Sequence, residues 1–149
     1  MRLFTEVVGQ PDLEKKLRAL GQALNTQQIL DEGAALMFNR TRSRFLAETS
    51  PDGVKWPVSK AAIRRAASGR GGGTLFDVGK MFRSLQVSAE GPDSRGIGTN
   101  ATSPKGFPYP LVHNFGLGFP KRQFLGFNQD DVGSMTRMII RRITEALAQ

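Results

Sequence analysis

The chain has one histidine, His113, and no cysteine. Any Ser-His-Asp or Cys-His arrangement would therefore depend on His113 alone. This residue lies in the segment LVHNFG, which predicts a short helical turn ended by glycine, and no serine stands in a G-x-S-x-G elbow. Because a functional histidine needs partners, we interpret His113 as a packed or interface residue that hydrogen-bonds to backbone. The residues predict no enzyme.

Metal and phosphate sites have no better support in the sequence. Acidic residues are scattered, and the pair Asp130 and Asp131 is typical of a helix start rather than of a metal site. The segment GRGGGT lacks the G-x-x-x-x-G-K-[ST] spacing of a phosphate loop, and no predicted strand precedes it. RGIGTN does not match a dinucleotide fingerprint either. We therefore predict no metal and no cofactor.

Basic side chains are the remaining candidates for a binding function. The net charge of +8 favours nucleic acid, anionic membrane surfaces or acidic proteins as partners, and does not choose among them. Aromatic residues make up only 8% of the chain, which argues against a stacking platform for single strands. Two interpretations stay open: solvated faces with subunit contacts, or contacts with a DNA backbone. The residues singled out for a DNA channel or a partner are Arg64, Arg65, Arg70, Lys121, Arg137 and Arg141.

The only tryptophan, Trp56, follows a Pro-Asp-Gly turn. A tryptophan in such a place anchors a loop on the core through its large apolar area. Tryptophan is also enriched in subunit interfaces, so both interpretations of Trp56 remain open at this point.

Apolar spacing and capping residues predict five helical segments. The second is capped by Asn25, with Gln28 in a capping-box position, and carries Arg40, Arg42 and Arg44 on the face opposite its apolar side. The last is capped by Asn128 and has an apolar face of Val132, Met135, Ile139, Ile143 and Leu147. The predicted helices cover residues 11–24, 26–47, 60–67, 75–85 (around Gly79) and the C-terminal segment after Asn128, with a shorter helical turn at 111–115.

Strand signals are fewer. Residues 85–89 and 96–99 flank the turn GPDSRG and predict a hairpin, and residues 124–127 predict another strand. Residues 68–73 and 100–110 predict loops, because they are rich in glycine or proline. The expected fold is α+β: N- and C-terminal helices packed on a small antiparallel sheet, with long central loops. We expect a single domain over 1–149, with 1–25 as a helical arm, and no membrane span or signal-peptide core.

Five short motifs, in this order, resemble the phage virion morphogenesis family. They are RFLAETSPDGVKWPVS, TLFDVGKMFRSL, RGIGTN, PLVHNFG and KRQFLGFNQDD, and the resemblance spans residues 29–147. The matching positions are Pro51, Asp52, Gly53, Trp56, Gly79, Arg83, Ser84, Gly98, His113, Phe115, Gly116, Arg122, Phe124, Leu125 and Gly126. Three positions depart from the family pattern: Asn114 replaces the usual Gln, Gln123 replaces a Pro, and Pro110 stands near the usual Tyr-Ala.

The resemblance implies a structural protein of tail completion, at the neck or head–tail junction of a tailed bacteriophage. Subunits of this kind form a closed ring, often sixfold, which contacts the tail tube and the head connector. The expected location is the virion, after assembly in the host cytoplasm, with nonspecific contact to phage DNA in the channel. The alternative is a basic nucleic-acid-binding module for DNA packaging or organisation.

Overall fold

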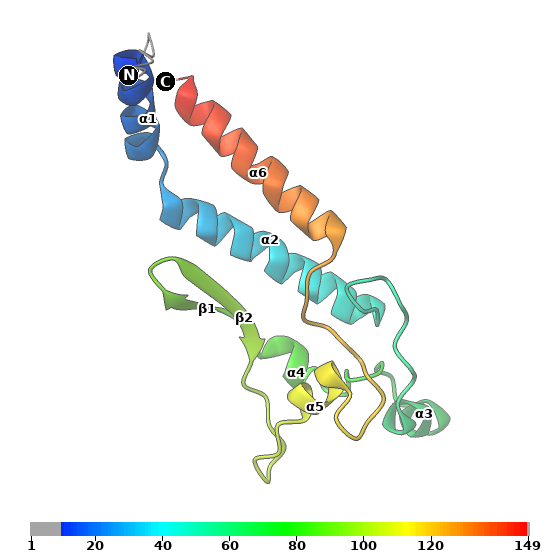
Figure 1. Cartoon of the computed structure of the whole chain (residues 1–149). Coiled ribbons are helices and arrows are strands. Elements are labelled where there is room, and N and C mark those ends of the chain that lie inside the picture. Colours follow the sequence, from blue (N-terminus) through cyan, green and yellow to red (C-terminus); the bar gives the residue numbers. More distant parts are fainter. Residues whose placement is uncertain (1–9, 149) are drawn as a thin grey trace, which may run out of the picture.

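A computed structural model describes residues 10–148 of the protein (Figure 1). Residues 1–9 and Gln149 lie outside the described residues. Two predictions fall partly on residues 1–9: the N-terminal helical arm and the absence of a signal-peptide core. The elements, in chain order, are α1 (Gln10–Ala23), α2 (Thr26–Ala47), α3 (Lys60–Ala67), α4 (Lys80–Arg83), β1 (Leu85–Gly91), β2 (Ser94–Thr99), α5 (Tyr109–Phe115) and α6 (Gln129–Leu147).

The helix α2 is the central element of the molecule. The hairpin of β1 and β2 packs on one side of it and α6 packs on the other, while α1 contacts α6 (Figure 1). The strands are antiparallel, with Leu85 paired to Thr99 and Val87 paired to Ile97. The predicted α+β class and the helices at both ends are confirmed. It is α2, however, and not the C-terminal helix, that covers the sheet.

Local sequence explains the limits and the packing of α2. The Asn25 side chain accepts a hydrogen bond from the Gln28 backbone N–H at 3.1 Å, as a helix cap should. The Gln28 side chain turns toward Glu32 instead of completing the predicted capping box. Gly33 is buried where α6 crosses, and a Cβ there would lie 3.5 Å from the Met135 methyl carbon. A small residue therefore lets the two helices approach closely.

The core lies between the C-terminal half of α2, the start of the hairpin and the irregular segment before α6. Phe45 is its centre: its ring lies 5.3 Å from that of Trp56 and 5.8 Å from that of Phe124, both edge to face. Such aromatic pairs add to the stabilisation gained by burial alone. The buried cluster comprises Phe45, Trp56, Met81, Leu85, Ala101 and Phe124.

Two predicted elements are wrong. The helix over 75–85 is reduced to α4, a single turn, because Leu75 and Gly79 adopt left-handed backbone conformations that interrupt it. The predicted strand over 124–127 is irregular, and its first two N–H groups bond to a side chain instead of a neighbouring strand. A short apolar run does not by itself identify a strand.

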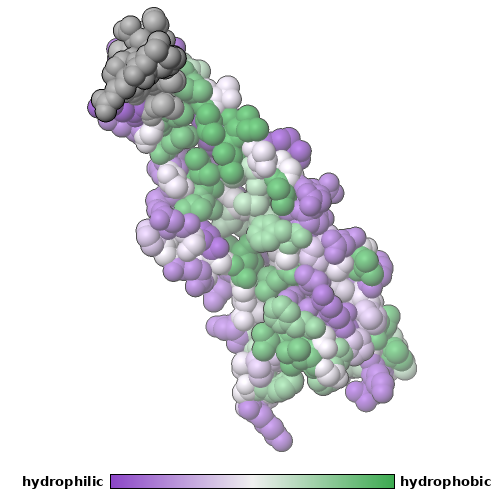
Figure 2. Space-filling view, viewed as in Figure 1, coloured by the Kyte–Doolittle hydropathy of each residue, from purple (hydrophilic) through white to green (hydrophobic). Residues whose placement is uncertain are grey.

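The helix α6 begins and ends as predicted but leaves much of its apolar face uncovered. Its methionines, Met135 and Met138, point toward Gly33 of α2. Four large apolar side chains on its outward side remain more than a third exposed: Val132, Ile139, Ile140 and Leu147. We call these four residues the α6 face. Figure 2 shows apolar side chains gathered along this part of the molecule.

Candidate functional site

One buried carboxylate joins α2 to the start of α6. Asp131 has no exposed surface, and its oxygens accept hydrogen bonds from Arg40 at 2.7 Å and from Arg44 at 2.7 and 2.5 Å. Asn128 and Asp131 also form a reciprocal capping box, with both bonds at 2.8 Å. We call Arg40, Arg44, Asn128 and Asp131 the Asp131 cluster. Both arginines depend on one buried carboxylate, and its loss would leave them without a counter-charge, so the cluster is suited to holding α2 against α6.

The protonation of Asp131 follows from these contacts. Burial by itself raises the pKa of this carboxyl, but the hydrogen bonds from Arg44, from the Asn128 backbone and from Arg40 together outweigh it. The pKa of Asp131 is therefore lowered, and the residue is charged at neutral pH.

The prediction that Arg40 and Arg44 lie on a face away from the packed side of α2 is wrong. Both side chains reach inward to Asp131, and the Arg44 side chain is only 12% exposed. Arg42 instead stacks its guanidinium 4.6 Å from the centre of the Phe82 ring. Sequence reasoning interpreted Asp131 as a helix start, which it is, but missed its second role. The helical period alone cannot reveal a partner 91 residues away.

Next to this cluster, the family motifs contact one another. The Trp56 indole N–H donates to the Gln123 carbonyl at 2.9 Å, and Trp56 is buried, so this residue anchors the loop after α2 on the core. The buried Asn114 side-chain oxygen accepts from the backbone N–H groups of Phe124 and Leu125 at 3.1 and 3.0 Å. One side chain thereby satisfies two donors of an irregular segment that lacks strand partners.

The turn before Trp56 is held from the other side. The Asn128 side-chain amide donates to the Pro51 carbonyl at 2.6 Å. A Cβ at Gly126 would lie 3.1 Å from the Pro51 ring, and the Gly126 φ of +145° suits glycine.

The remaining motif residues have structural positions in the fold. Asp52 and Gly53 form an exposed turn, and Gly79 and Gly116 cap α4 and α5. In the hairpin region, Gly98 pairs with Gln86 and the Ser84 hydroxyl forms a hydrogen bond with the Thr99 hydroxyl. Arg83 and Phe115 are exposed.

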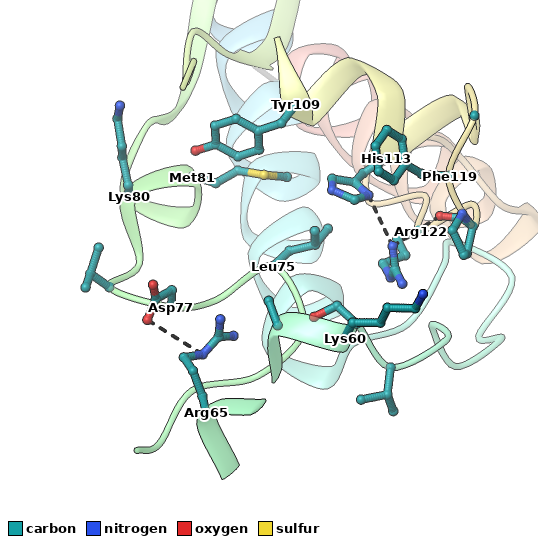
Figure 3. Close-up of a pocket in the computed structure, with 16 residues that line it drawn as sticks. Lys60, Arg65, Leu75, Asp77, Lys80, Met81, Tyr109, His113, Phe119 and Arg122 are labelled. Atoms are coloured by element: carbon teal, nitrogen blue, oxygen red, sulfur yellow. Dashed lines mark hydrogen bonds and ion pairs between the residues drawn. The ribbon is translucent and has the colours of Figure 1, made fainter. Parts of the chain in front are cut away.

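A groove opens beside these motifs, between the start of α3, the segment before α4, and α5 (Figure 3). Its volume is about 800 Å³. Apolar side chains line much of it: Val58, Leu75, Val78, Met81, Tyr109 and Phe119. Its charged and titratable lining residues are Lys60, Arg65, Asp77, Lys80, His113 and Arg122. We call this hollow the groove.

Arg122 occupies the inner wall of the groove and is only 4% exposed. Its Nε donates to the Pro57 carbonyl at 2.7 Å, and its Nη1 lies 3.2 Å from His113 Nδ1. Burial lowers the pKa of His113, and the positive charge of Arg122 lowers it further, so this histidine is neutral at pH 7. His113 is half-buried and bonds the Arg122 backbone N–H through its carbonyl, in line with its interpretation as a packed residue.

The six basic candidates do not form one surface. Arg64, Arg65 and Arg70 lie at α3 and the loop after it, where the last two each approach Asp77 at 3.6 Å. Lys121 is exposed beside Gly116. On α6, well away from α3, Arg137 bonds Ser134 and Arg141 approaches Glu145 (Figure 1). These six residues therefore do not form one continuous basic track.

The described residues contain neither a candidate metal site nor a candidate membrane-spanning helix. No group of three or more acidic or histidine side chains within 10–148 is arranged to hold a metal ion. Among the same residues, no helix has both the length and the apolar character needed to cross a bilayer.

Comparison with known proteins agrees with the motifs. Neither a curated protein nor a solved structure matches the chain. The family model of the phage virion morphogenesis family matches residues 10–144, which is nearly the whole chain. The chain therefore belongs to the phage virion morphogenesis family, and its role is in building the phage virion.

Proposed function

We propose that the protein is a structural subunit of a tail completion ring, at the head–tail junction of a tailed bacteriophage. The family supports a role in virion construction. In the motif region, the side chains of Trp56, His113 and Asn114 take part in hydrogen bonds within the chain. A protein of this kind works by docking to copies of itself and to neighbouring rings.

The observation that carries this proposal is a pair of separate apolar surfaces. The first is the α6 face, where Ile140 is 57% exposed and Leu147 59% exposed. The second lies at the opposite end, on α5 and the turn after it, outside the groove, where Phe115 is 61% exposed and Leu117 55% exposed (Figure 2). A ring closes through head-to-tail contacts, so each subunit needs two different adhesive surfaces. Exposed apolar patches of this kind mark interaction sites in a protein that is otherwise well folded.

The alternative, a DNA-binding module, draws its support from the net charge of +8. The basic residues singled out for DNA contact are not gathered on one face, however. Arg64, Arg65 and Arg70 lie at α3 and the loop after it, whereas Arg137 and Arg141 lie on α6. We therefore rank DNA contact as an accessory to ring assembly, for arginines that face a channel.

The test is the mass of the purified protein by light scattering after size-exclusion chromatography, over a range of salt. We expect an oligomer near six subunits, and Ile140→Asp should reduce it to a monomer without unfolding it, because a charge cannot be buried in an apolar contact. The matched control is Val54→Asp, which alters an exposed valine of the turn after α2. A monomer at every salt concentration, with DNA affinity that falls steeply as salt rises, would favour the alternative.

A further inference from the structure

Arg122 differs from the two arginines of the Asp131 cluster. It is only 4% exposed, yet it forms no ion pair with a carboxylate among the residues that the structure describes. Its hydrogen-bond partners are the carbonyl oxygens of Pro57 and Pro120 and the neutral ring of His113. A buried cation without a counter-charge is costly, since it has lost its hydration and gained only dipoles in return.

The groove around Arg122 likewise has more positive than negative side chains. Lys60 and Lys80 stand at its rim, while its one carboxylate, Asp77, lies on the far side from Arg122 and approaches Arg65 instead (Figure 3). The Arg65 Nε atom lies 3.6 Å from an Asp77 carboxylate oxygen, which is too far for a hydrogen bond, and it is buried without a hydrogen-bond partner. The groove therefore has an excess of positive charge against an apolar lining.

We propose that the groove receives a segment of a partner protein in which an acidic side chain stands between apolar residues. The carboxylate would bond Arg122 on the inner wall, and the flanking apolar side chains would contact Leu75, Val78 and Phe119. This deepens the proposed function, on which it rests, by naming the chemistry of one docking partner.

Charge favours a different protein over a second copy of this chain as the occupant. The chain carries a net charge of +8, so contact between copies at a cationic groove gains little from electrostatics. A nucleic-acid backbone fits poorly for another reason: its phosphates are met by exposed cations, whereas Arg122 lies at the back of an apolar groove. A carboxylate flanked by apolar side chains matches both the positive charge and the apolar lining of the groove. The planar guanidinium of arginine also fits the planar geometry of a carboxylate.

The experiment is a selection of random 12-residue peptides displayed for binding to the full-length protein, with counter-selection on Arg122→Met. We expect the selected peptides to share an Asp or Glu between apolar residues. Their affinity should fall roughly tenfold for Arg122→Met, and likewise when the peptide acid is changed to its amide, as expected for loss of a charged hydrogen bond. Lys60→Glu should weaken the same peptides, whereas Lys105→Glu, an equal charge change at an exposed lysine outside the groove, should not.

Several outcomes would overturn the proposal. Selected peptides without acidic residues, or peptides that bind Arg122→Met and Lys60→Glu as tightly as the unchanged protein, would do so. Displacement of the peptides by millimolar inorganic phosphate or by duplex DNA would assign the site to free anions or nucleic acid. Loss of the ring in Lys60→Glu, at unchanged folding, would make a second copy the occupant. Ring mass is measured separately, so peptide binding without a ring would contradict the proposed function and not this inference.

Discussion

The Asp131 cluster and the groove each hold an arginine that is largely shielded from solvent, Arg44 and Arg122, and they differ in whether that arginine has a counter-charge. In the cluster, Arg40 and Arg44 share the fully buried Asp131. In the groove, Arg122 has carbonyl oxygens and a neutral histidine. Arginines that share a carboxylate of their own chain hold two elements of that chain together. A buried arginine without a carboxylate partner is the place where, in our proposal, a carboxylate from another protein binds, and the two regions therefore have different uses.

The largest expected effect comes from removing the charge of the cluster. Asp131→Asn should lower the free energy of unfolding by about 3–5 kcal/mol, because it leaves Arg40 and Arg44 without their counter-charge. Chemical denaturation monitored by the fluorescence of Trp56 measures this loss. The matched control is the neighbouring Asp130→Asn, an exposed residue of the same helix turn, which should cost less than about 1 kcal/mol. Equal losses for the two variants would remove the distinction between the cluster and an ordinary helix start.

A smaller effect is expected in the groove. Arg122→Met should lower the free energy of unfolding by about 1–2 kcal/mol, since it loses the bonds to Pro57 and Pro120 but also removes an uncompensated buried cation. The same denaturation experiment applies. A loss as large as that of Asp131→Asn would mean that Arg122 holds the fold in the way that Arg44 does.

The smallest effect is a pH dependence specific to the groove. The pKa of His113 is lowered, by burial first and by Arg122 second, so the unfolded chain binds a proton more readily than the folded one. The contribution of His113 is thus fully present above pH 6.5 and is lost as the pH falls through its lowered pKa. Stability should decline modestly from pH 7 to pH 5, and His113→Gln should lack this decline.

That comparison is clean because the chain contains a single histidine. The Asp131 cluster responds in a different range. The pKa of Asp131 is lowered below its usual 3.8, so its contribution is present above that pH and is lost only in stronger acid. If His113→Gln kept the slope between pH 5 and 7, the groove would not be its source.

Local signals in the sequence predicted much of the fold. Asn25 and Asn128 indicated the starts of α2 and α6, and the turn GPDSRG indicated the hairpin, because caps and turns depend on residues a few positions apart. The same kind of reasoning was wrong at Gly79 and at residues 124–127. At these positions, contacts with distant segments determine the backbone conformation, and local propensity does not predict such contacts.

By itself, the sequence determined the boundaries of α2 and α3, the α+β class, the single histidine on which any triad would depend, and the ordered motifs of the family. Only the tertiary structure decided which arginines are paired. Arg44 and Arg122 are the same residue type, and both precede apolar segments, so the sequence does not distinguish them. Arg44 meets Asp131 because α2 and α6 cross at Gly33, whereas Arg122 faces a groove that brings it no carboxylate from residues 10–148. The reason is physical: charge pairing depends on distances in space, and these are set by packing between elements far apart in the chain.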